Sequence, residues 1–174
     1  MSLSEHFIPL HWAHLTNWGD SFAPLLAEFL SELPVFQIKM SDPGFVAIGS
    51  LVGAGHGEQA EFWGTGIITQ HAKPNPRAKY HAVRGPLTRR QIIQSGGDCP
   101  EVYGDPGMLV THVFPCGDVE KQFRLGIVPH WREIVHFRKF RWNDPSVNLI
   151  NVATSDLEGF CRCINQCDVI ITSS

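Results

Sequence analysis

Short apolar runs alternate with helical patterns through the second half of this 174-residue sequence. Phe123–Val128, Val147–Val152 and Val169–Thr172 have the length and composition of strands, whereas Arg132–Phe140 and Asp156–Cys167 repeat apolar residues at helical spacing. A strand–helix–strand–helix–strand order implies parallel strands joined by right-handed crossovers. We therefore predict an α/β fold whose second half holds only about half the strands of a normal doubly wound sheet.

The first half of the sequence repeats this alternation less regularly. One amphipathic helix, capped by Asp20 or Ser21, is expected to end at Pro34, and a second is expected from Pro86 to Gly96. The other apolar runs predict strands at Phe7–Trp12, Phe45–Gly49, Phe62–Ile68, Tyr80–Val83 and Val102-Tyr103.

A linker is expected between the two halves. Residues 111–122 contain Pro115, Gly117 and several polar residues, which is the composition of a connecting segment. We therefore place an N-terminal domain at residues 1–115 and a partial C-terminal domain at residues 120–174.

Composition narrows the class of protein. Hydrophobic residues make up 43% of the chain, so a core can form without disulfides, and the five cysteines fit reduced thiols. The formal charge of −3 gives no indication of a nucleic-acid surface. No apolar run reaches the roughly 20 residues of a membrane helix, and the first seven residues do not have the pattern of a signal peptide. We expect a cytoplasmic protein that does not bind nucleic acid.

Two polar loops after predicted strands in the first half carry glycines, at positions where parallel sheets bind ligands. In Asn17–Asp20, Gly19 allows a ligand to approach the backbone beside a helix N-terminus, although spacing alone favours a simple turn capped by Asp20. The loop Gly49–Gly57, with Gly53 and Gly55, is similar to a phosphate-binding loop but lacks the lysine of a Walker motif. A flexible loop explains that pattern equally well.

Two further loops carry charged or titratable residues. Arg84 ends a predicted strand at a helix N-terminus and Arg89 follows about one turn later, so two guanidinium groups are available to a small dianion. The alternative is a set of surface cations, which we expect for Arg90. His130 ends the strand Phe123–Val128 with a side chain that exchanges protons near neutral pH, although a single histidine is more often structural.

Several other chemistries lack support. Cys161 and Cys163 would point about 200° apart on a helix, so they and Cys167 do not form a metal site. The sequence contains neither His-Glu-x-x-His nor Gly-x-Ser-x-Gly, which removes the zinc-hydrolase and serine-hydrolase signatures. We expect no metal.

Taken in order, the loops form a set that covers nearly the whole chain. Its members are Asn17-Trp18-Gly19-Asp20, Gly49-Ser50-Leu51 with Gly53 and Gly55, Trp63-Gly64-Thr65-Gly66, Ala82-Val83-Arg84-Gly85-Pro86-Leu87-Thr88-Arg89, Val102-Tyr103-Gly104-Asp105-Pro106, Gly126-Ile127-Val128-Pro129-His130-Trp131 and Asp168-Val169-Ile170-Ile171-Thr172-Ser173-Ser174. This ordered set resembles the polysaccharide pyruvyl transferase family. The stretch around Arg84 and the stretch around Asp105 are the most distinctive parts of the resemblance.

The resemblance implies a transferase that moves pyruvate from phosphoenolpyruvate onto a sugar of an exopolysaccharide or cell-wall polymer as a ketal. It also implies two Rossmann-like halves resembling a GT-B glycosyltransferase, the second incomplete in this chain. Phosphoenolpyruvate would be the donor substrate and no cofactor would be needed. A lipid-linked or nucleotide-linked saccharide would be the acceptor and would hold the protein at the inner membrane face.

Ketal formation needs a proton donor, acceptors for hydroxyl protons and cations that hold the donor's carboxylate and phosphate. The candidate substrate-binding residues are Arg84, Arg89, Asn17, Gly19, Gly53 and Gly55. The candidate catalytic residues are His130 as the acid, and Asp20 and Asp105 as acceptors for sugar hydroxyls.

One departure from the family concerns the end of the sequence. In the family, the final strand is followed by a Leu-His-Gly stretch whose histidine is thought to be catalytic, whereas this sequence ends at Ser174. We therefore expect the strand Val169–Thr172 to leave an open edge that is covered by such a stretch or by another copy of the chain.

Two other classes of function stay open. A nucleotide-sugar glycosyltransferase is suggested by the two-half architecture and the glycine-containing loop. A non-catalytic remnant that binds a glycan or a protein partner is suggested by the missing stretch. The first would be recognised by stabilisation with a nucleotide sugar instead of phosphoenolpyruvate.

Overall fold

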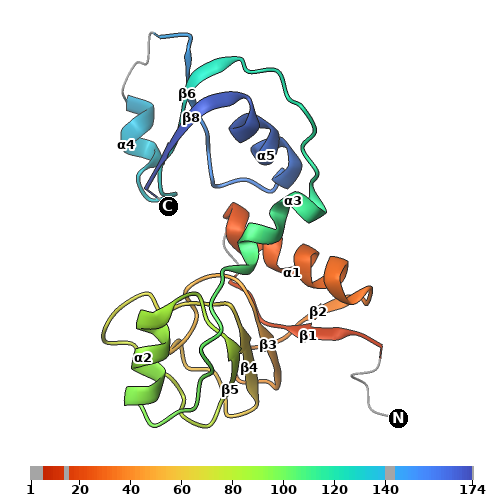
Figure 1. The fold of residues 1–174 in the computed structure, drawn as a ribbon, viewed down its shortest axis with the longest axis vertical. Coiled ribbons are helices and arrows are strands. Elements are labelled where there is room, and N and C mark those ends of the chain that lie inside the picture. Colours follow the sequence, from red (N-terminus) through yellow and green to blue (C-terminus); the bar gives the residue numbers. More distant parts are fainter. Residues whose placement is uncertain (1–5, 14–15, 140–143, 174) are drawn as a thin grey trace. The chain divides into compact units, whose positions relative to one another are not determined.

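The computed structural model of the chain describes residues 6–13, 16–139 and 144–173. Its contacts divide the chain into two compact units (Figure 1). The first unit contains the described residues of Met1–His14 and Phe22–Val113, and the second contains those of Leu15–Ser21 and Phe114–Ser174. The short segment before residue 22 therefore packs with the C-terminal residues, which the sequence did not indicate.

The first unit contains a five-stranded parallel sheet in the order β2-β1-β3-β4-β5. Its strands are β1 (Ile8–Leu10), β2 (Val35–Gln37), β3 (Gly44–Val46), β4 (Ala60–Trp63) and β5 (Lys79–Ala82). Its helices are α1 (Trp18–Ser31, whose first residues belong to the second unit), α2 (Pro86–Gln94), the 3₁₀ helix η2 (Pro106–Leu109) and α3 (Val110–Val113).

Helices α1 and α2 pack on opposite faces of this sheet. Neighbouring residues of a strand point to opposite faces. Phe62 and Tyr80 therefore join Ile92 of α2 in one buried cluster, whereas Trp63 and His81 line a pocket of about 490 Å³ together with residues of α1. The part of the sheet formed by β4 and β5 is consequently well covered only on the α2 face.

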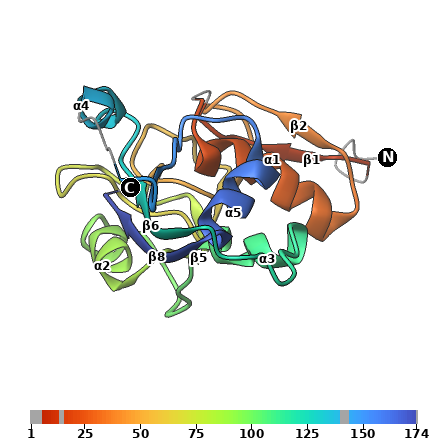
Figure 2. The same cartoon turned by 90° about the horizontal axis from the view of Figure 1, so that it is seen from above.

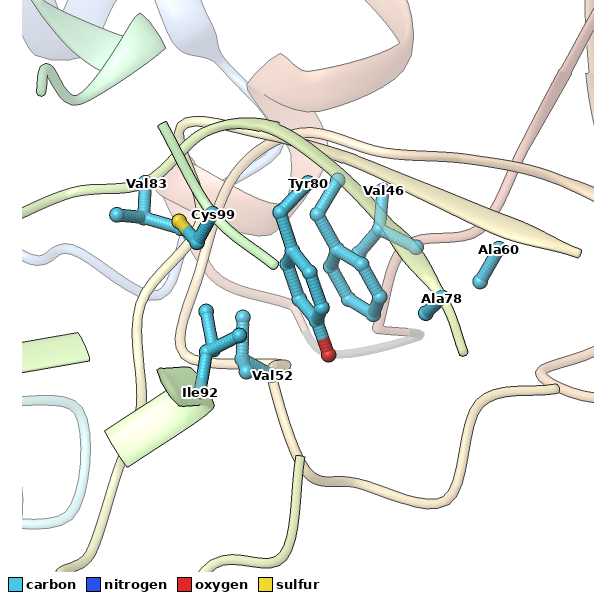
Figure 3. Packing of buried hydrophobic residues seen from close by; sticks show 9 residues of the cluster. Val46, Val52, Ala60, Ala78, Tyr80, Val83, Ile92 and Cys99 are labelled. Carbon is cyan, nitrogen blue, oxygen red and sulfur yellow. The ribbon is translucent and has the colours of Figure 1, made fainter. Parts of the chain in front are cut away.

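The buried cluster on the α2 face is one hydrophobic core of the first unit (Figure 3). The rings of Phe62 and Tyr80 stack with centroids 4.9 Å apart at an interplanar angle of 14°. The Tyr80 hydroxyl donates a hydrogen bond to the Asn75 carbonyl at 2.9 Å, so the polar end of this buried ring is satisfied. The other members of the cluster are Val46, Val52, Ala60, Ala78, Val83, Ile92 and Cys99.

The second unit contains a three-stranded parallel sheet in the order β7-β6-β8. Its elements are β6 (Phe123–Val128), α4 (Ile134–Lys139), β7 (Val147–Leu149), α5 (Leu157–Asn165) and β8 (Cys167–Thr172). Because β7 and β8 lie on opposite sides of β6, right-handed crossovers put α4 and α5 on opposite faces, as Figure 2 shows. Side chains of α5, β6 and β8 form the core of this unit with Ile150 and Val152.

The structure confirms an α/β protein with parallel sheets, but it corrects the start of the first helix. This helix begins at Trp18, so neither Asp20 nor Ser21 is its N-cap. The Asn17 carbonyl accepts the first helical bond, from the Ser21 amide at 3.0 Å, and the Trp18 amide donates to the Val152 carbonyl at 2.9 Å. Contacts within the second unit therefore start the helix three to four residues earlier than an N-cap at Asp20 or Ser21 would have done.

The strands are also shorter than predicted. The run Phe62–Ile68 leaves the sheet after Trp63, because Gly64 turns the chain with a φ of 85°. Val102-Tyr103 contributes only an isolated bridge between Val83 and Tyr103. Strand β2 was missed because its three residues directly follow Pro34, which had been interpreted only as a helix stop.

Three predictions in the second half need smaller corrections. The helix expected at Arg132–Phe140 begins at Ile134, and Phe140 lies outside the described residues, as does Ser174. The strand expected to reach Val152 ends at Leu149, and part of the expected linker is the helix α3. In the described part of the chain, no helix is long and apolar enough to cross a membrane.

Candidate functional site

Thr65 joins the loops that follow β3, β4 and β5 in the first unit. Its hydroxyl donates to the Gly49 carbonyl at 2.7 Å and accepts from the Leu51 amide at 3.3 Å. Its own carbonyl accepts from the Arg84 amide at 3.1 Å. The side chain is fully buried, at 0% exposure, so these bonds are shielded from water. The three loops are therefore held in one fixed arrangement at the carboxyl edge of the sheet.

Arg84 lies on top of this arrangement. Its Nη2 donates to the Ser50 hydroxyl at 2.8 Å, although the residue as a whole is exposed. A Cβ atom built on Gly66 would come within 2.5 Å of the guanidinium, so this position must be glycine for Arg84 to lie where it does. The exposed guanidinium has no carboxylate partner among the described residues. It is thus a positioned cation that is available to an anion.

Helix α2 begins directly after Arg84. Gly85 occupies the N-cap position and provides no side-chain cap, and Pro86 is the first helical residue. The amides of the first turn are therefore open to an anionic ligand, in addition to the arginine. A cavity of about 440 Å³ lies beside this turn, lined by Leu87, Thr88 and Arg90 of α2 and by residues of the segment Ile67–Gln70.

Arg89 and Asp105 have intramolecular partners. Arg89 donates through Nε to the Cys99 carbonyl at 2.9 Å and lies 3.3 Å from a Glu101 carboxylate oxygen. Asp105 caps η2, with its carboxylate accepting from the Gly107 amide at 2.9 Å. Arg89 is thus held by Cys99 and Glu101, whereas the Arg84 side chain donates to Ser50, and the joint binding of an anion by the two arginines stays a prediction.

The glycine-containing loop carries a residue that the sequence did not single out. Gly53 and Gly55 both have positive φ, at 83° and 102°. His56 follows them and is only 6% exposed, and neither of its ring nitrogens has a hydrogen-bond partner among the described residues. Burial lowers its pKa to about 4; the nearby His11 adds to this, while the Leu51 backbone opposes it. The ring is therefore neutral at physiological pH and packs edge-on against His11 and Phe62.

Asn17, Gly19 and Asp20 belong to the second unit. Asp20 is 9% exposed and accepts a hydrogen bond from Asn17 Nδ2 at 3.2 Å. Burial raises the pKa of this carboxyl, and the hydrogen bond from Asn17 opposes the rise. A carboxyl with these properties is more easily protonated than an exposed one, which suits it to proton transfer. A Cβ atom built on Gly19 would meet no atom within 4 Å. There is therefore open space at Gly19, next to Asp20 in the sequence.

His130 also belongs to the second unit and follows β6. Its Nδ1 accepts from the Arg132 backbone amide at 3.3 Å, so in the neutral ring the proton lies on Nε2. Its backbone amide donates to the Ser173 hydroxyl at 2.9 Å, which ties it to the end of β8. His130 thus presents an N–H donor at the carboxyl edge of its sheet.

The structure pairs predicted site residues in the second unit, whereas in the first unit the residues around Arg84 were not predicted as site residues. In the first unit Arg84 is surrounded by Ser50, Thr65 and Gly66. Sequence reasoning missed the role of Thr65, although a threonine between two glycines at the end of a strand was a signal that could have indicated it. In the second unit the structure pairs Asn17 with Asp20.

The described residues contain no group of three or more His, Cys, Asp or Glu side chains that could hold a metal ion.

Comparison of the chain with known protein families, curated proteins and solved structures found no relative. The chain matches no protein-family model, and neither a curated protein nor a solved structure is significantly similar to it.

Proposed function

We propose that this chain is a transferase that binds phosphoenolpyruvate at Arg84 and moves its pyruvate onto a saccharide as a ketal. The observation that carries the proposal is the position of Arg84, which is held by Ser50 over Gly66 at the uncapped N-terminus of α2. A guanidinium fork beside free backbone amides suits a ligand that carries both a carboxylate and a phosphate. The reaction itself comes from the sequence resemblance.

The proposed reaction is balanced without a cofactor. A proton adds to the methylene carbon of phosphoenolpyruvate, one sugar hydroxyl oxygen bonds to the resulting cationic carbon, and a second displaces phosphate. The two hydroxyl protons go to basic groups and to the released phosphate. In this proposal Asp20 accepts a hydroxyl proton, and His130 acts as the acid in its imidazolium form and returns to the neutral ring when it has given up the proton. The GT-B-like pairing of two Rossmann-like domains and a lipid-linked or nucleotide-linked acceptor belong to the same proposal.

Thermal unfolding with two candidate donors tests the binding step. Phosphoenolpyruvate at 100 times its Kd should add about 2.7 kcal/mol to the free energy of unfolding. Arg84→Gln should abolish this stabilisation, whereas Lys73→Gln, which removes an exposed cation elsewhere in the first unit, should leave it unchanged. Phosphate release in the presence of acceptor glycans then tests transfer.

The nucleotide-sugar glycosyltransferase is retained as the second candidate, because the two parallel sheets are compatible with a Rossmann-like fold. Stabilisation by a nucleotide sugar, with none from millimolar phosphoenolpyruvate, would replace the first proposal by this one. If neither donor stabilises the chain, a non-catalytic role in binding a glycan or a protein becomes the next hypothesis to test.

A further inference from the structure

Positive charge is concentrated in one stretch of this otherwise acidic chain. Residues 121–139 contain five of the 14 Lys and Arg residues but only one of the 17 Asp and Glu residues. This stretch has a formal charge of +4, against −3 for the whole chain. Although the whole chain has a negative formal charge, residues 121–139 are therefore a basic stretch, of the kind that binds anionic partners.

Helix α4 displays the cations at the end of this stretch. Its first residue, Ile134, is buried at 8% exposure and faces its own unit. Val135, His136, Arg138 and Lys139 are exposed, and Val135 reaches 59%. Figure 2 shows α4 at the outer margin of the second unit, on the side of β6 opposite α5. The exposed side of α4 thus combines two permanent cations with an apolar residue.

The turn before α4 adds a third cation. The Arg132 guanidinium lies over the Trp131 ring, 4.9 Å from its centroid, and Trp131 in turn packs against the core of the second unit. This contact holds Arg132 in place while keeping its charge at the surface. The single acid of the stretch, Glu133, accepts a hydrogen bond from Ser173. In the described part of the chain, none of Arg132, Arg138 and Lys139 forms an ion pair.

We propose that this α4 surface, formed by Arg132, Val135, His136, Arg138 and Lys139, docks on an anionic lipid bilayer. The unpaired cations complement the lipid phosphates, and the exposed valine between them can enter the headgroup region. Nucleic acid fits this surface less well, because a helix of six residues offers a short row of cations interrupted by an apolar side chain. The inference is independent of the proposed transferase activity.

Co-sedimentation with vesicles tests this inference. The full chain is mixed with vesicles of phosphatidylcholine and phosphatidylglycerol, and with vesicles of phosphatidylcholine alone. Binding is expected only to the anionic vesicles and should be lost at about 1 M salt, where the screening length is about 3 Å. Each Lys or Arg near such a surface strengthens binding about fivefold, so Arg138→Gln combined with Lys139→Gln should weaken it about 25-fold.

The matched control removes the same charge elsewhere. Lys39→Gln combined with Lys73→Gln neutralises two exposed lysines of the first unit and should leave vesicle binding within about twofold of the unchanged chain. Circular dichroism melts of both double variants confirm that they fold. Equal loss in the two double variants would overturn the proposal, as would equal binding to both kinds of vesicle. Binding to a DNA duplex but not to vesicles would also overturn it.

Discussion

The Thr65 hydroxyl donates a hydrogen bond to the Gly49 carbonyl at 2.7 Å, across 16 positions of the sequence. The same oxygen accepts from the Leu51 amide, so one buried atom fixes both ends of the turn after β3. Arg84 depends on this arrangement, because its amide donates to the Thr65 carbonyl and its side chain to Ser50 within that turn.

Thr65→Val should destabilise the first unit. The substitution keeps the side-chain volume but removes a donor and an acceptor from a fully buried position, which costs about 1–3 kcal/mol. Thr65→Ser is the control, because it keeps the hydroxyl and loses one methyl group worth about 0.8 kcal/mol. Urea unfolding measures both, and a valine variant as stable as the serine variant would show that the hydroxyl does not hold the loops.

Gly66→Ala should separate binding from stability. A new Cβ would lie within 2.6 Å of three guanidinium atoms of Arg84, and that flexible group can move away at small cost. We expect the free energy of unfolding to change by less than about 1 kcal/mol, while stabilisation by phosphoenolpyruvate is lost. Gly104→Ala, which meets no atom within 4 Å, should retain it. Unchanged ligand stabilisation in the Gly66 variant would exclude Arg84 from the binding site.

His56 should make the fold sensitive to acid. The pKa of the folded ring is about 4, below the ordinary value of 6.5, so between these pH values only the unfolded chain takes up the proton. The free energy of unfolding is therefore highest above pH 6.5 and decreases as the pH falls towards 4, with a loss of about 1–2 kcal/mol between pH 7 and pH 5. His56→Gln removes this component, and the difference between the two unfolding curves across pH measures it. If stability fell equally with pH in the unchanged chain and in the His56→Gln variant, the lowered pKa of His56 would be contradicted.

Strand β8 should support self-association. It pairs with β6 on one side, and among the described strands none lies on its other side. Val169 and Ile171 are 55% and 58% exposed along it. A second copy of the chain would cover this edge, so we expect the mass measured by light scattering to fall on dilution. Val169→Lys should give a monomer, whereas Leu87→Lys, at a position 71% exposed in the first unit, should not change the mass.

The sequence predicted the second sheet well because its elements are regular. Phe123–Val128 is a strand over the predicted range. The helix expected at Asp156–Cys167 begins at Leu157, after Asp156 as its N-cap, and ends at Asn165 because Cys167 already belongs to β8. These features depend on local patterning and capping. The first helix was misplaced because its start is determined by a distant acceptor, the Val152 carbonyl, which no local pattern indicates.

The sequence indicated where Arg84 lies, but not the contacts of the other candidate residues. Arg84 was identified from its position between a strand and a helix, and the structure leaves its guanidinium exposed. Arg89 has the same side chain one turn later, but its direction is determined by Cys99 and Glu101, which lie beyond the helix. His56 was missed because burial, not residue type or spacing, gives it an unusual pKa.

The placement of Trp18 in the second unit has a consequence for synthesis on the ribosome. Its indole nitrogen donates to the Leu157 carbonyl, 139 residues further along, and its ring stacks on Phe160 at 5.4 Å. The tryptophan leaves the exit tunnel long before its partners, because they are translated at least 139 residues later. Until then an apolar side chain stays uncovered on the nascent polypeptide, which makes it a natural contact for ribosome-associated chaperones.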